Sequence, residues 1–499
     1  MRLPARSDIG RPLGPVAFGV LWFAGGGLGL GPDAAAALAC TAWIVVWWVT
    51  EAVPIPVTSL LPVALFPLTG VLDASATTTA YGDPIVFLLL GGFLLALAVE
   101  RTGLHERISL LVISRVGVSA PGLLFGFMTA TALLSMWISN TATAMLMVPI
   151  AIAVISQTYT VTDGPQVDVG EGVGEMVHDT DEDPADLPAT RFGVALMLGI
   201  AYAASVGGVG TLIGSPPNAV LAGVAESQLG VDVGFLEWMQ FGFPVAVVGT
   251  LAVWATLLVV VRPTVDVVPG REAIAAHKLA ELGPPSPGER RVAALFGLVA
   301  LGWLTRPFLI SPVFPEVTDA TIAIAGGIAA FLVPVNARRR EFLLDWEYAL
   351  RLPWGVLLLL GAGFALARAF QRTGLDRRTA DLITGAGMTE LVGLVVLLAV
   401  TVVVLTNVTS NTATASVFTP IAVAVATSIG APPLTLMATV ALAASFAFVL
   451  PVATAPNAIV FGSGYLSIPE MAKVGAAVSV TGTAVIVVGV VWWLPFVWG

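Results

Sequence analysis

A short polar triplet occurs twice inside long apolar stretches of this 499-residue chain. Residues 139–141 and residues 410–412 both read Ser-Asn-Thr. Non-helical backbone is tolerated at membrane depth only where protein buries it or water reaches it. Hydroxyl, carboxamide and carbonyl oxygens suit a hard cation such as Na⁺, whereas N–H and O–H donors at helix N-termini suit an anion. The sequence therefore predicts that each triplet lies at a ligand-binding turn, where a cation and an anion can meet.

The two triplets belong to an internal repeat. Residues 135–154 and 406–425 are identical at eleven of twenty positions, at an offset of 271 (406 minus 135). Upstream, residues 101–104 recur as residues 372–375 at the same offset. One constant offset over this distance indicates duplication. With an odd number of membrane crossings between the copies, the second half would be inverted, which is a common construction of secondary transporters.

A Gly- or Pro-rich piece follows each triplet. GTLIGSPPN at residues 210–218 corresponds to LPVATAPN at residues 450–457, so Asn218 matches Asn457. Glycine permits close backbone approach, and proline removes an amide donor and frees a carbonyl. We expect residues 207–218 and 450–457 to be unwound breaks in crossing helices. Close helix packing in lipid is the competing explanation for Gly, Ser and Thr, but two symmetric copies favour ligand binding.

The elements that position these residues must cross a membrane. Hydrophobic residues make up 57% of the chain and charged residues 11%, with a mean hydropathy of +0.93. Soluble domains carry about 25% charged residues. The apolar residues come in blocks of about twenty, the length that spans the hydrocarbon core. We predict an all-α polytopic membrane protein with about eleven transmembrane helices. Residues 121–156 and 391–428 are expected to form two re-entrant helical hairpins.

The charge pattern predicts an orientation and a loop. Clusters of Arg and Lys at residues 2–11, 271–291 and 338–340 place the N-terminus in the cytoplasm. The net charge of −10 is concentrated in Asp163 to Asp186, a polar, aperiodic segment that reads as a disordered cytoplasmic loop. With only two lysines in the chain, this balance fits a prokaryote that is salt-loving, although a GC-rich genome would also deplete lysine.

Several function classes find no support in the sequence. The single cysteine, Cys40, cannot form an intramolecular disulfide, and the three histidines have no metal-ligand spacing. GSGYL at residues 462–466 lacks the strand-turn-helix context of a hydrolase nucleophile. The chain is therefore predicted not to be an enzyme, and we expect no organic cofactor and no nucleic-acid partner.

Four motifs together resemble those of the divalent anion/sodium symporter (DASS) family. They are the paired Ser-Asn-Thr triplets, TLIGSPPN at 211–218, PVATAPNAIVFGSGYL at 451–466 and TEAVPIPVTSLLP at 50–62. The resemblance covers nearly the whole chain. It implies a homodimer in the cell membrane, surrounded by lipid, in which an elevator-type transport domain slides against a scaffold. The implied order is scaffold spans 1–120, hairpin 121–156, acidic loop 157–191, broken helix and span 192–261, cytoplasmic loop 262–291, scaffold spans 292–385, hairpin 386–430, and broken helix and last span 431–499.

The resemblance also implies two sodium sites and one anion site. The first sodium site corresponds to Ser135, Ser139, Asn140 and Gly214. The second sodium site corresponds to Thr406, Ser410, Asn411 and Ala453. The substrate carboxylates would be held by Asn140, Thr141, Ser215, Asn411, Thr412 and Thr454.

The function that follows is sodium-coupled import of a divalent anion. Two symmetric Asn-Thr pairs suit C4-dicarboxylates such as succinate, malate or fumarate, which carry a charge at each end. A dicarboxylate exchanger, a sulfate or citrate symporter, and a proton-coupled or metalloid efflux carrier would share the architecture. One residue departs from the family pattern, because Ala455 stands where a second proline is expected. This departure puts the second break's side of the anion site in doubt.

Overall fold

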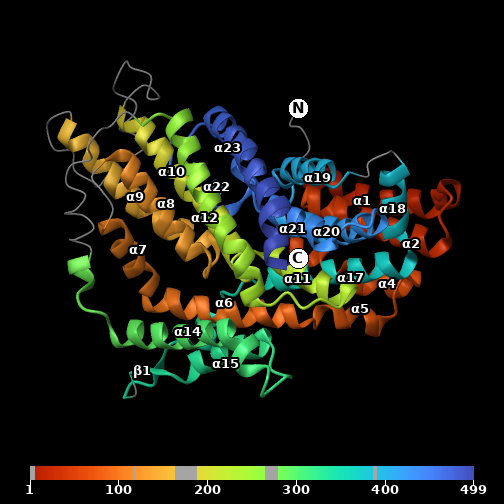
Figure 1. The fold of residues 1–499 in the computed structure, drawn as a ribbon, viewed down its shortest axis with the longest axis horizontal. Helices are drawn as coiled ribbons and strands as arrows, with labels where there is room; N and C mark the ends of the chain where they lie inside the picture. The colour runs from red at the N-terminus through yellow and green to blue at the C-terminus, as the bar shows by residue number, and fades with distance from the viewer. Residues whose placement is uncertain are drawn as a thin grey trace.

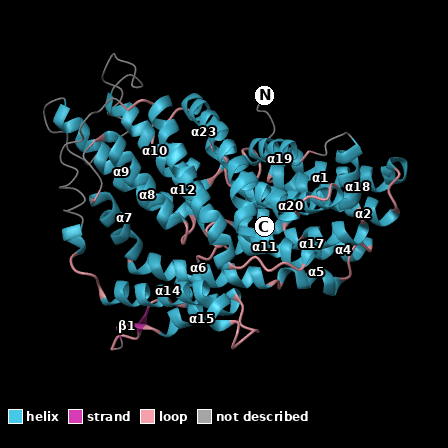
Figure 2. Ribbon diagram, in the orientation of Figure 1, coloured by secondary structure: helices cyan, strands magenta, loops and turns pink. Residues whose placement is uncertain are grey.

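The computed structural model describes residues 6–115, 119–162, 188–263, 279–336, 338–385 and 390–498. These residues are almost entirely helical (Figure 1, Figure 2). The strands among them are β1 (Pro334–Asn336) and β2 (Glu341–Phe342), which pair antiparallel in a short hairpin. The acidic segment 163–186, predicted to be a disordered loop, lies outside the described residues. The all-α prediction is confirmed.

The helices have the length and composition of a multi-pass membrane protein. Among the described residues, seven helices are long and apolar enough to cross a membrane, and six shorter helices are also apolar. These helices differ widely in burial. The apolar 18-residue stretch of Arg191–Gly210 is wholly buried inside the protein, whereas only 11% of the corresponding stretch of Pro287–Ile310 is buried. The first is a central helix, and the second presents most of its apolar side chains at the surface of the protein. The count of eleven crossings stays a prediction.

Helix bounds repeat along the chain as the sequence does. Helix α7 (Leu104–Ser114) corresponds to α18 (Leu375–Gly385), and α8 (Ala120–Ser135) corresponds to α19 (Leu391–Thr406). Each of these bounds is displaced by 271 residues (375 minus 104, 391 minus 120). The preceding pair, α6 (Pro84–Thr102) and α17 (Trp354–Thr373), ends at the same offset, and α9 (Asn140–Thr162) and α20 (Asn411–Ser428) begin at it. The internal repeat is therefore confirmed as a structural repeat.

Both predicted helix breaks are present, with one correction. In the first half, α10 (Pro188–Gly207) and η3 (Gly208–Gly210) precede α11 (Pro216–Leu229). In the second half, α21 (Pro433–Ala444) and η5 (Pro451–Ala453) precede α22 (Ala455–Phe461). The second break begins at residue 445, earlier than the predicted residue 450. Pro216, Pro217 and Pro456 lie in the first turns of α11 and α22, where no proline N–H is needed. Pro451 lies within the second break.

Several helices pack side by side around α10, and others pack along α6. Figure 1 shows α8, α9, α10, α12 and α23 side by side, with α14 and α15 along α6. The amphipathic helices α7 and α18 were not predicted, because each is too short for a hydropathy window. The other elements are α1 (Arg6–Ala24), η1 (Gly25–Leu28), α2 (Pro32–Thr50), α3 (Ile55–Thr58), α4 (Leu61–Thr69), α5 (Ala74–Tyr81), α12 (Phe235–Val260), α14 (Pro287–Thr305), η4 (Arg306–Ile310), α15 (Asp319–Leu332), α16 (Trp346–Ala349), α23 (Ile468–Val488), η6 (Gly489–Trp493) and α24 (Leu494–Trp498).

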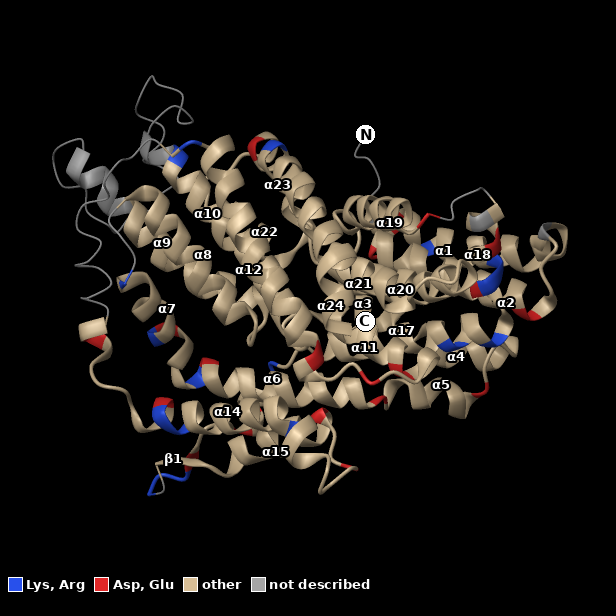
Figure 3. Cartoon of the chain, viewed as in Figure 1, with Lys and Arg blue, Asp and Glu red and all other residues tan. Residues whose placement is uncertain are grey.

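Charged residues gather at helix ends and connections. Figure 3 shows the long helices α8, α10 and α12 as almost uncharged along their length. A charge at the bilayer centre is costly, so this distribution agrees with helices that run through hydrocarbon.

The two halves are interlocked around the breaks. Helix α11 of the first half packs against α20 of the second half, and α22 of the second half packs against α9 and α10 of the first. Each half therefore contributes its broken helix to the hairpin of the other. The helix after each break is thus held against the helix that follows the triplet of the other half.

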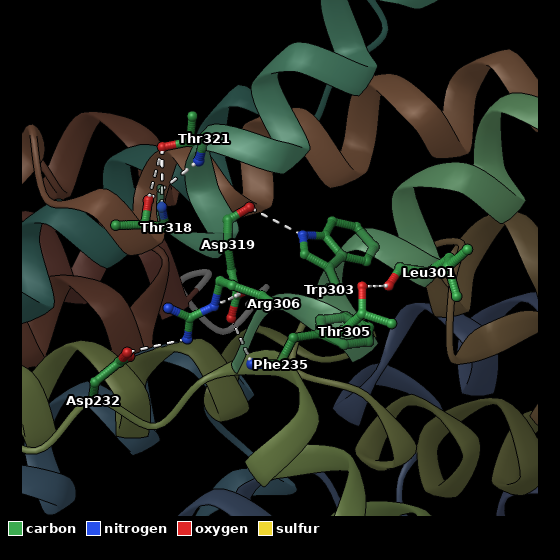
Figure 4. Close-up of polar contacts among 9 residues, drawn as sticks. All are labelled: Asp232, Phe235, Leu301, Trp303, Thr305, Arg306, Thr318, Asp319 and Thr321. Atoms are coloured by element: carbon green, nitrogen blue, oxygen red, sulfur yellow. Dashed lines mark hydrogen bonds and ion pairs between the residues drawn. The ribbon is translucent and has the colours of Figure 1, made fainter. Parts of the chain in front are cut away.

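A buried ion network ties the end of α11 to α14 and α15 (Figure 4). Arg306 Nε lies 2.6 Å from Asp319 Oδ1, and Arg306 Nη2 lies 3.1 Å from Asp232 Oδ2. The other carboxylate oxygen of Asp319 accepts the Phe235 N–H at 2.7 Å, and the backbone carbonyl of Asp319 accepts the Trp303 indole N–H at 3.0 Å. Only 12% of the Arg306 side chain and 8% of the Asp319 side chain are exposed. One guanidinium thus holds together three separate segments.

We expect Arg306→Met to destabilise the protein strongly, because it leaves the Asp319 carboxylate buried without its cation. Breaking one partner of a buried pair costs about 3 to 5 kcal/mol, whereas replacing both partners is often close to neutral. The double variant Arg306→Met/Asp319→Asn keeps the acceptor for Phe235 and should recover most of the loss. Thermal unfolding of the purified protein in detergent measures both variants. Equal midpoints for the single and double variants would contradict this account of the network.

Candidate functional site

Each triplet lies in a turn between two helices, and the residue that ends the first helix binds the asparagine of the triplet. The Ser135 hydroxyl lies 2.6 Å from Asn140 Oδ1 and 2.7 Å from the Ala204 carbonyl oxygen. In the second half, the Thr406 hydroxyl lies 2.8 Å from Asn411 Oδ1 and 2.9 Å from the Ala444 carbonyl. A hydroxyl has one proton, so it cannot satisfy both acceptors fully. Each turn therefore holds more oxygen lone pairs than protons, which favours a cation.

One asparagine spans each break. Asn218 Nδ2 donates to the carbonyl oxygens of Gly208 at 3.1 Å and Thr211 at 2.8 Å. Asn457 Nδ2 donates to the corresponding carbonyls of Ala447 and Leu450, both at 3.0 Å. Both asparagine side chains are fully buried, and neither Oδ1 has a hydrogen-bond partner within the described ranges. The amide thus replaces the helical N–H groups that the unwound backbone lacks.

A second tether joins each triplet turn to its break, but the two halves build it differently. In the first half, the Thr211 hydroxyl donates to the Met136 carbonyl and accepts the Gly214 N–H. In the second half, Leu450 replaces Thr211 and Asn407 replaces Met136. Asn407 Oδ1 accepts the Val449 N–H at 2.8 Å. The polar side chain has moved from the break to the turn, and the tether is kept.

The first break brings four oxygen atoms close to two glycines. A Cβ at Gly214 would lie 2.5 Å from the Gly208 carbonyl oxygen and 2.9 Å from that of Met136. A Cβ at Gly208 would lie 2.8 Å from both Asn140 Oδ1 and the Gly214 carbonyl oxygen. The absence of two side chains therefore leaves a cradle among four oxygens, which suits a hard cation. We call this space the Gly208–Gly214 cradle.

The residues predicted for the first sodium site meet around this cradle. Ser135 and Asn140 hydrogen-bond to each other, and the space at Gly208 borders Asn140 and Gly214. Ser139 lies at the exposed end of the turn, where its Oγ accepts the Ala142 N–H at 3.2 Å. The oxygen set present fits Na⁺, with no need for a charged ligand.

The second predicted sodium site is built on the same plan with two methyl groups added. Ala447 and Ala453 stand where the first half has Gly208 and Gly214. The hydrogen bond of Thr406 to Asn411 is kept. The side chain of Ser410 makes no capping bond to α20, unlike that of Ser139. A cation in the second half would therefore lie in a differently shaped space.

The residues predicted to bind the anion lie in the triplet turns and just before the helices that follow the breaks, in both halves. Ser215 is buried before α11 and Thr454 is half-buried before α22, where its hydroxyl accepts the Asn457 N–H. Tyr202 of α10 donates to the Phe448 carbonyl at 3.0 Å, which joins α10 of the first half to the second break. At the triplets, Asn140, Thr141 and Asn411 are half-buried, whereas Thr412 is buried.

Neither the turns nor the breaks contain a titratable side chain. Residues 135–143, 204–218, 406–412 and 444–457 include no Asp, Glu, His, Lys, Arg, Cys or Tyr. An anion there would meet neutral donors and the N-termini of α9 and α20, whose free N–H groups and dipoles favour negative charge. Helix α11 begins with two prolines, which have no N–H, so its N-terminus contributes its dipole. The arrangement suits binding and release, and it lacks the side chains that general acid–base catalysis requires.

Comparison with known proteins agrees with this site. Residues 12–498 match the family described as the sodium:sulfate symporter transmembrane region. The chain belongs to this family. It is also 39% identical, over 467 residues, to the sodium-dependent dicarboxylate transporter SdcS of Staphylococcus aureus strains USA300 and NCTC 8325, covering 93% of this chain and 86% of each relative. The family and these relatives are transporters, which confirms that the chain is not an enzyme.

A solved structure has the same fold at lower sequence similarity. The YdaH transporter of Alcanivorax borkumensis, whose crystal structure is described as having an unusual topology, aligns with a TM-score of 0.52. The two chains are 16% identical, and the alignment covers 85% of this chain and 88% of that one. This likeness concerns the fold alone.

Four polar residues of the site were missing from the predicted ligand set. They are Asn218, Asn457, Thr211 and Asn407. The match of Asn218 to Asn457 was visible in the repeat, and only their role in spanning a break required coordinates. The exchange of Thr211 for Leu450 and Met136 for Asn407 gave no signal, because the two members of each tether lie far apart in the sequence.

We expect Gly214→Ala to weaken sodium dependence, because the new methyl would lie 2.5 Å from the Gly208 carbonyl oxygen and fill the cradle. The measurement is the Na⁺ concentration that gives half-maximal thermal stabilisation of the purified protein, with choline as the reference cation. It should rise by about tenfold or more, because a methyl this close to the Gly208 and Met136 carbonyls keeps a cation from reaching them. Gly297→Ala, at an exposed position of α14 with open space around it, is the matched control. An unchanged Na⁺ response in Gly214→Ala would rule out a cation in the cradle.

Asn218→Asp and Asn457→Asp should each destabilise the fold, because a carboxylate cannot donate to the two carbonyls that the amide spans. Two orphaned buried carbonyls cost about 2 to 6 kcal/mol together, at about 1 to 3 each. The control is Asn336→Asp, since Asn336 uses its oxygen to accept the Arg338 and Arg339 N–H groups. Thermal unfolding in detergent gives the comparison. If all three variants unfold alike, the amides do not hold the breaks.

Proposed function

We propose that this chain is a sodium-coupled symporter that imports divalent anions across the cell membrane, with C4-dicarboxylates such as succinate, malate or fumarate as substrates. The name of the relative SdcS, a sodium-dependent dicarboxylate transporter, supports both the coupling ion and the substrate class. The family description names sulfate, so sulfate and citrate stand as competing substrates of the same site. We further propose a cytoplasmic N-terminus and a homodimer.

The observation that carries the proposal is the Gly208–Gly214 cradle beside a triplet turn. Its oxygens come from Met136, Asn140, Gly208 and Gly214, and they supply no formal charge. Such a set binds a small hard cation more readily than an anion. The free N–H groups at the start of α9 lie next to it in the chain and suit an anion instead. The two ligand types would thus share one turn.

Coupling follows from charge balance. A dianion in a protein region without Lys or Arg is poorly compensated, because helix dipoles supply only about half a unit of charge at each end. Sodium ions at the turns would provide the missing positive charge within a few ångströms, where attraction is strong at low dielectric. Anion affinity should therefore depend on Na⁺, and each ligand should raise the affinity of the other by the same factor.

The transport step is proposed to be a rigid-body movement of the hairpins and broken helices against the other spans. The exchange of contacts between the halves, α11 with α20 and α22 with α9, supports movement of these elements as one unit. The inverted arrangement of the two halves would then offer equivalent pathways to the two sides of the membrane.

We expect Asn140→Ala and Asn411→Ala to reduce succinate uptake below about a tenth of wild type, because each removes the amide shared by the cation and the anion. Uptake of radiolabelled succinate into proteoliposomes, with an inward Na⁺ gradient or with K⁺ in place of Na⁺, measures this. Asn336→Ala, at the last residue of β1, is the control. Competition with malate, citrate and sulfate ranks the substrates.

Two outcomes of this assay would contradict the proposal. Full uptake in either triplet variant would mean that the two turns do not form one site. Wild-type uptake that is indifferent to Na⁺ but driven by internal dicarboxylate would identify an exchanger on the same fold.

A further inference from the structure

We propose that Ser445 is a further positioning residue of the anion site, which turns the hydroxyl proton of Ser215 toward the bound carboxylate. The inference rests on the proposed function, because it takes Ser215 as a ligand of the anion. Ser445 lies at the C-terminal end of α21 in the second half of the chain, and Ser215 lies before α11 in the first half. Nothing in the sequence brings these two residues together.

The two hydroxyls are in direct contact inside the protein. Ser215 Oγ lies 2.9 Å from Ser445 Oγ, and the two residues are 2% and 1% exposed. Ser215 occupies the N-cap position of α11, yet its side chain caps no N–H of that helix. Thr454, in the same position before α22, does cap its own helix. The Ser215 hydroxyl is therefore engaged by the other half of the chain.

Counting protons shows what an anion would change. Ser445 Oγ also lies 3.3 Å from the Ala441 carbonyl oxygen. Without an anion, Ser445 can donate to Ala441 while Ser215 donates to Ser445, so both protons are used. A carboxylate only accepts hydrogen bonds, and Ser215 must then give its proton to the substrate. The contact between the two hydroxyls survives only if Ser445 leaves Ala441 and donates to Ser215.

That exchange is favourable, since the bond to Ala441 is long and weak. In the loaded site the hydrogen bonds run from Ser445 to Ser215 and from Ser215 to the carboxylate. Hydrogen bonds in series polarise one another, so the Ser215 proton becomes a better donor. Without the Ser445 hydroxyl, Ser215 is free to rotate toward the Asn218 N–H, since Pro216 and Pro217 at the start of α11 have no N–H. Part of its contribution to anion binding would then be lost.

The repeat supplies a matched control. Ser205 follows Ala204, whose carbonyl binds Ser135, as Ser445 follows Ala444, whose carbonyl binds Thr406. Ser205 is 1% exposed, and its hydroxyl has no hydrogen-bond partner among the residues that the structure describes. Ser205→Ala therefore removes an equally buried hydroxyl from the equivalent place without breaking a link between the halves.

The test is the KM for succinate in proteoliposomes at saturating Na⁺, with Vmax normalised to reconstituted protein. We expect Ser445→Ala to raise KM by about threefold to tenfold while Vmax is retained, the effect of losing one hydrogen bond. Ser205→Ala should keep the wild-type KM. Because Ser445 acts through Ser215, the double variant Ser215→Ala/Ser445→Ala should have the KM of Ser215→Ala alone.

A wild-type KM in Ser445→Ala would overturn the inference, and so would a double variant whose KM rises by the product of the two single effects. If Ser445→Ala does not reconstitute, Ser445→Cys keeps the side-chain volume with a weaker donor. Its KM should also rise, and an unchanged KM would overturn the inference. Wild-type uptake in the same vesicles tests the proposed function separately. Without it, that function fails and the inference falls with it.

Discussion

The structure depends on how two stretches of unwound backbone satisfy their carbonyl groups inside an apolar protein. At membrane depth each unpaired backbone group is expensive, and water is not available to every one. One asparagine amide in each half donates to two carbonyls across the break. The Gly208 carbonyl that accepts the Asn218 amide also belongs to the Gly208–Gly214 cradle, and it has a second lone pair. That lone pair, the other cradle oxygens and the hydroxyls before α11 and α22 remain for ligands. The breaks can therefore be both stable and open to binding.

The two halves show which parts of this arrangement tolerate change. The amide across the break and the hydroxyl that binds the triplet asparagine are kept in both. The tether between turn and break is kept as an interaction, although Thr211 is lost and Asn407 is gained. The two glycines of the cradle become alanines in the second half. The two halves have thus diverged at the glycines of the cradle. They have kept the hydrogen bonds that hold the unwound backbone.

The repeat, the two turns and the two breaks could be predicted from the sequence, because local residue types indicate each of them. Helix bounds at an offset of 271 follow from the duplication (375 minus 104). The start of the second break at Ser445 was misplaced by five residues (450 minus 445), since residues 445–449 read as an ordinary apolar helix. The contact of Ser445 with Ser215 and the network of Arg306 with Asp319 depend on packing between distant elements. Periodicity and motif spacing carry no information about such pairs.

The central claim is that cations at the turns create the anion site, and succinate binding to the purified protein tests it most directly. Calorimetric titration of succinate at increasing Na⁺, with K⁺ keeping the ionic strength constant, separates binding from transport. The account predicts that succinate affinity rises steeply with Na⁺ and that no binding is detected in K⁺ alone. Equal affinity in Na⁺ and K⁺ would show that the neutral turns hold the anion by themselves, and it would contradict the account.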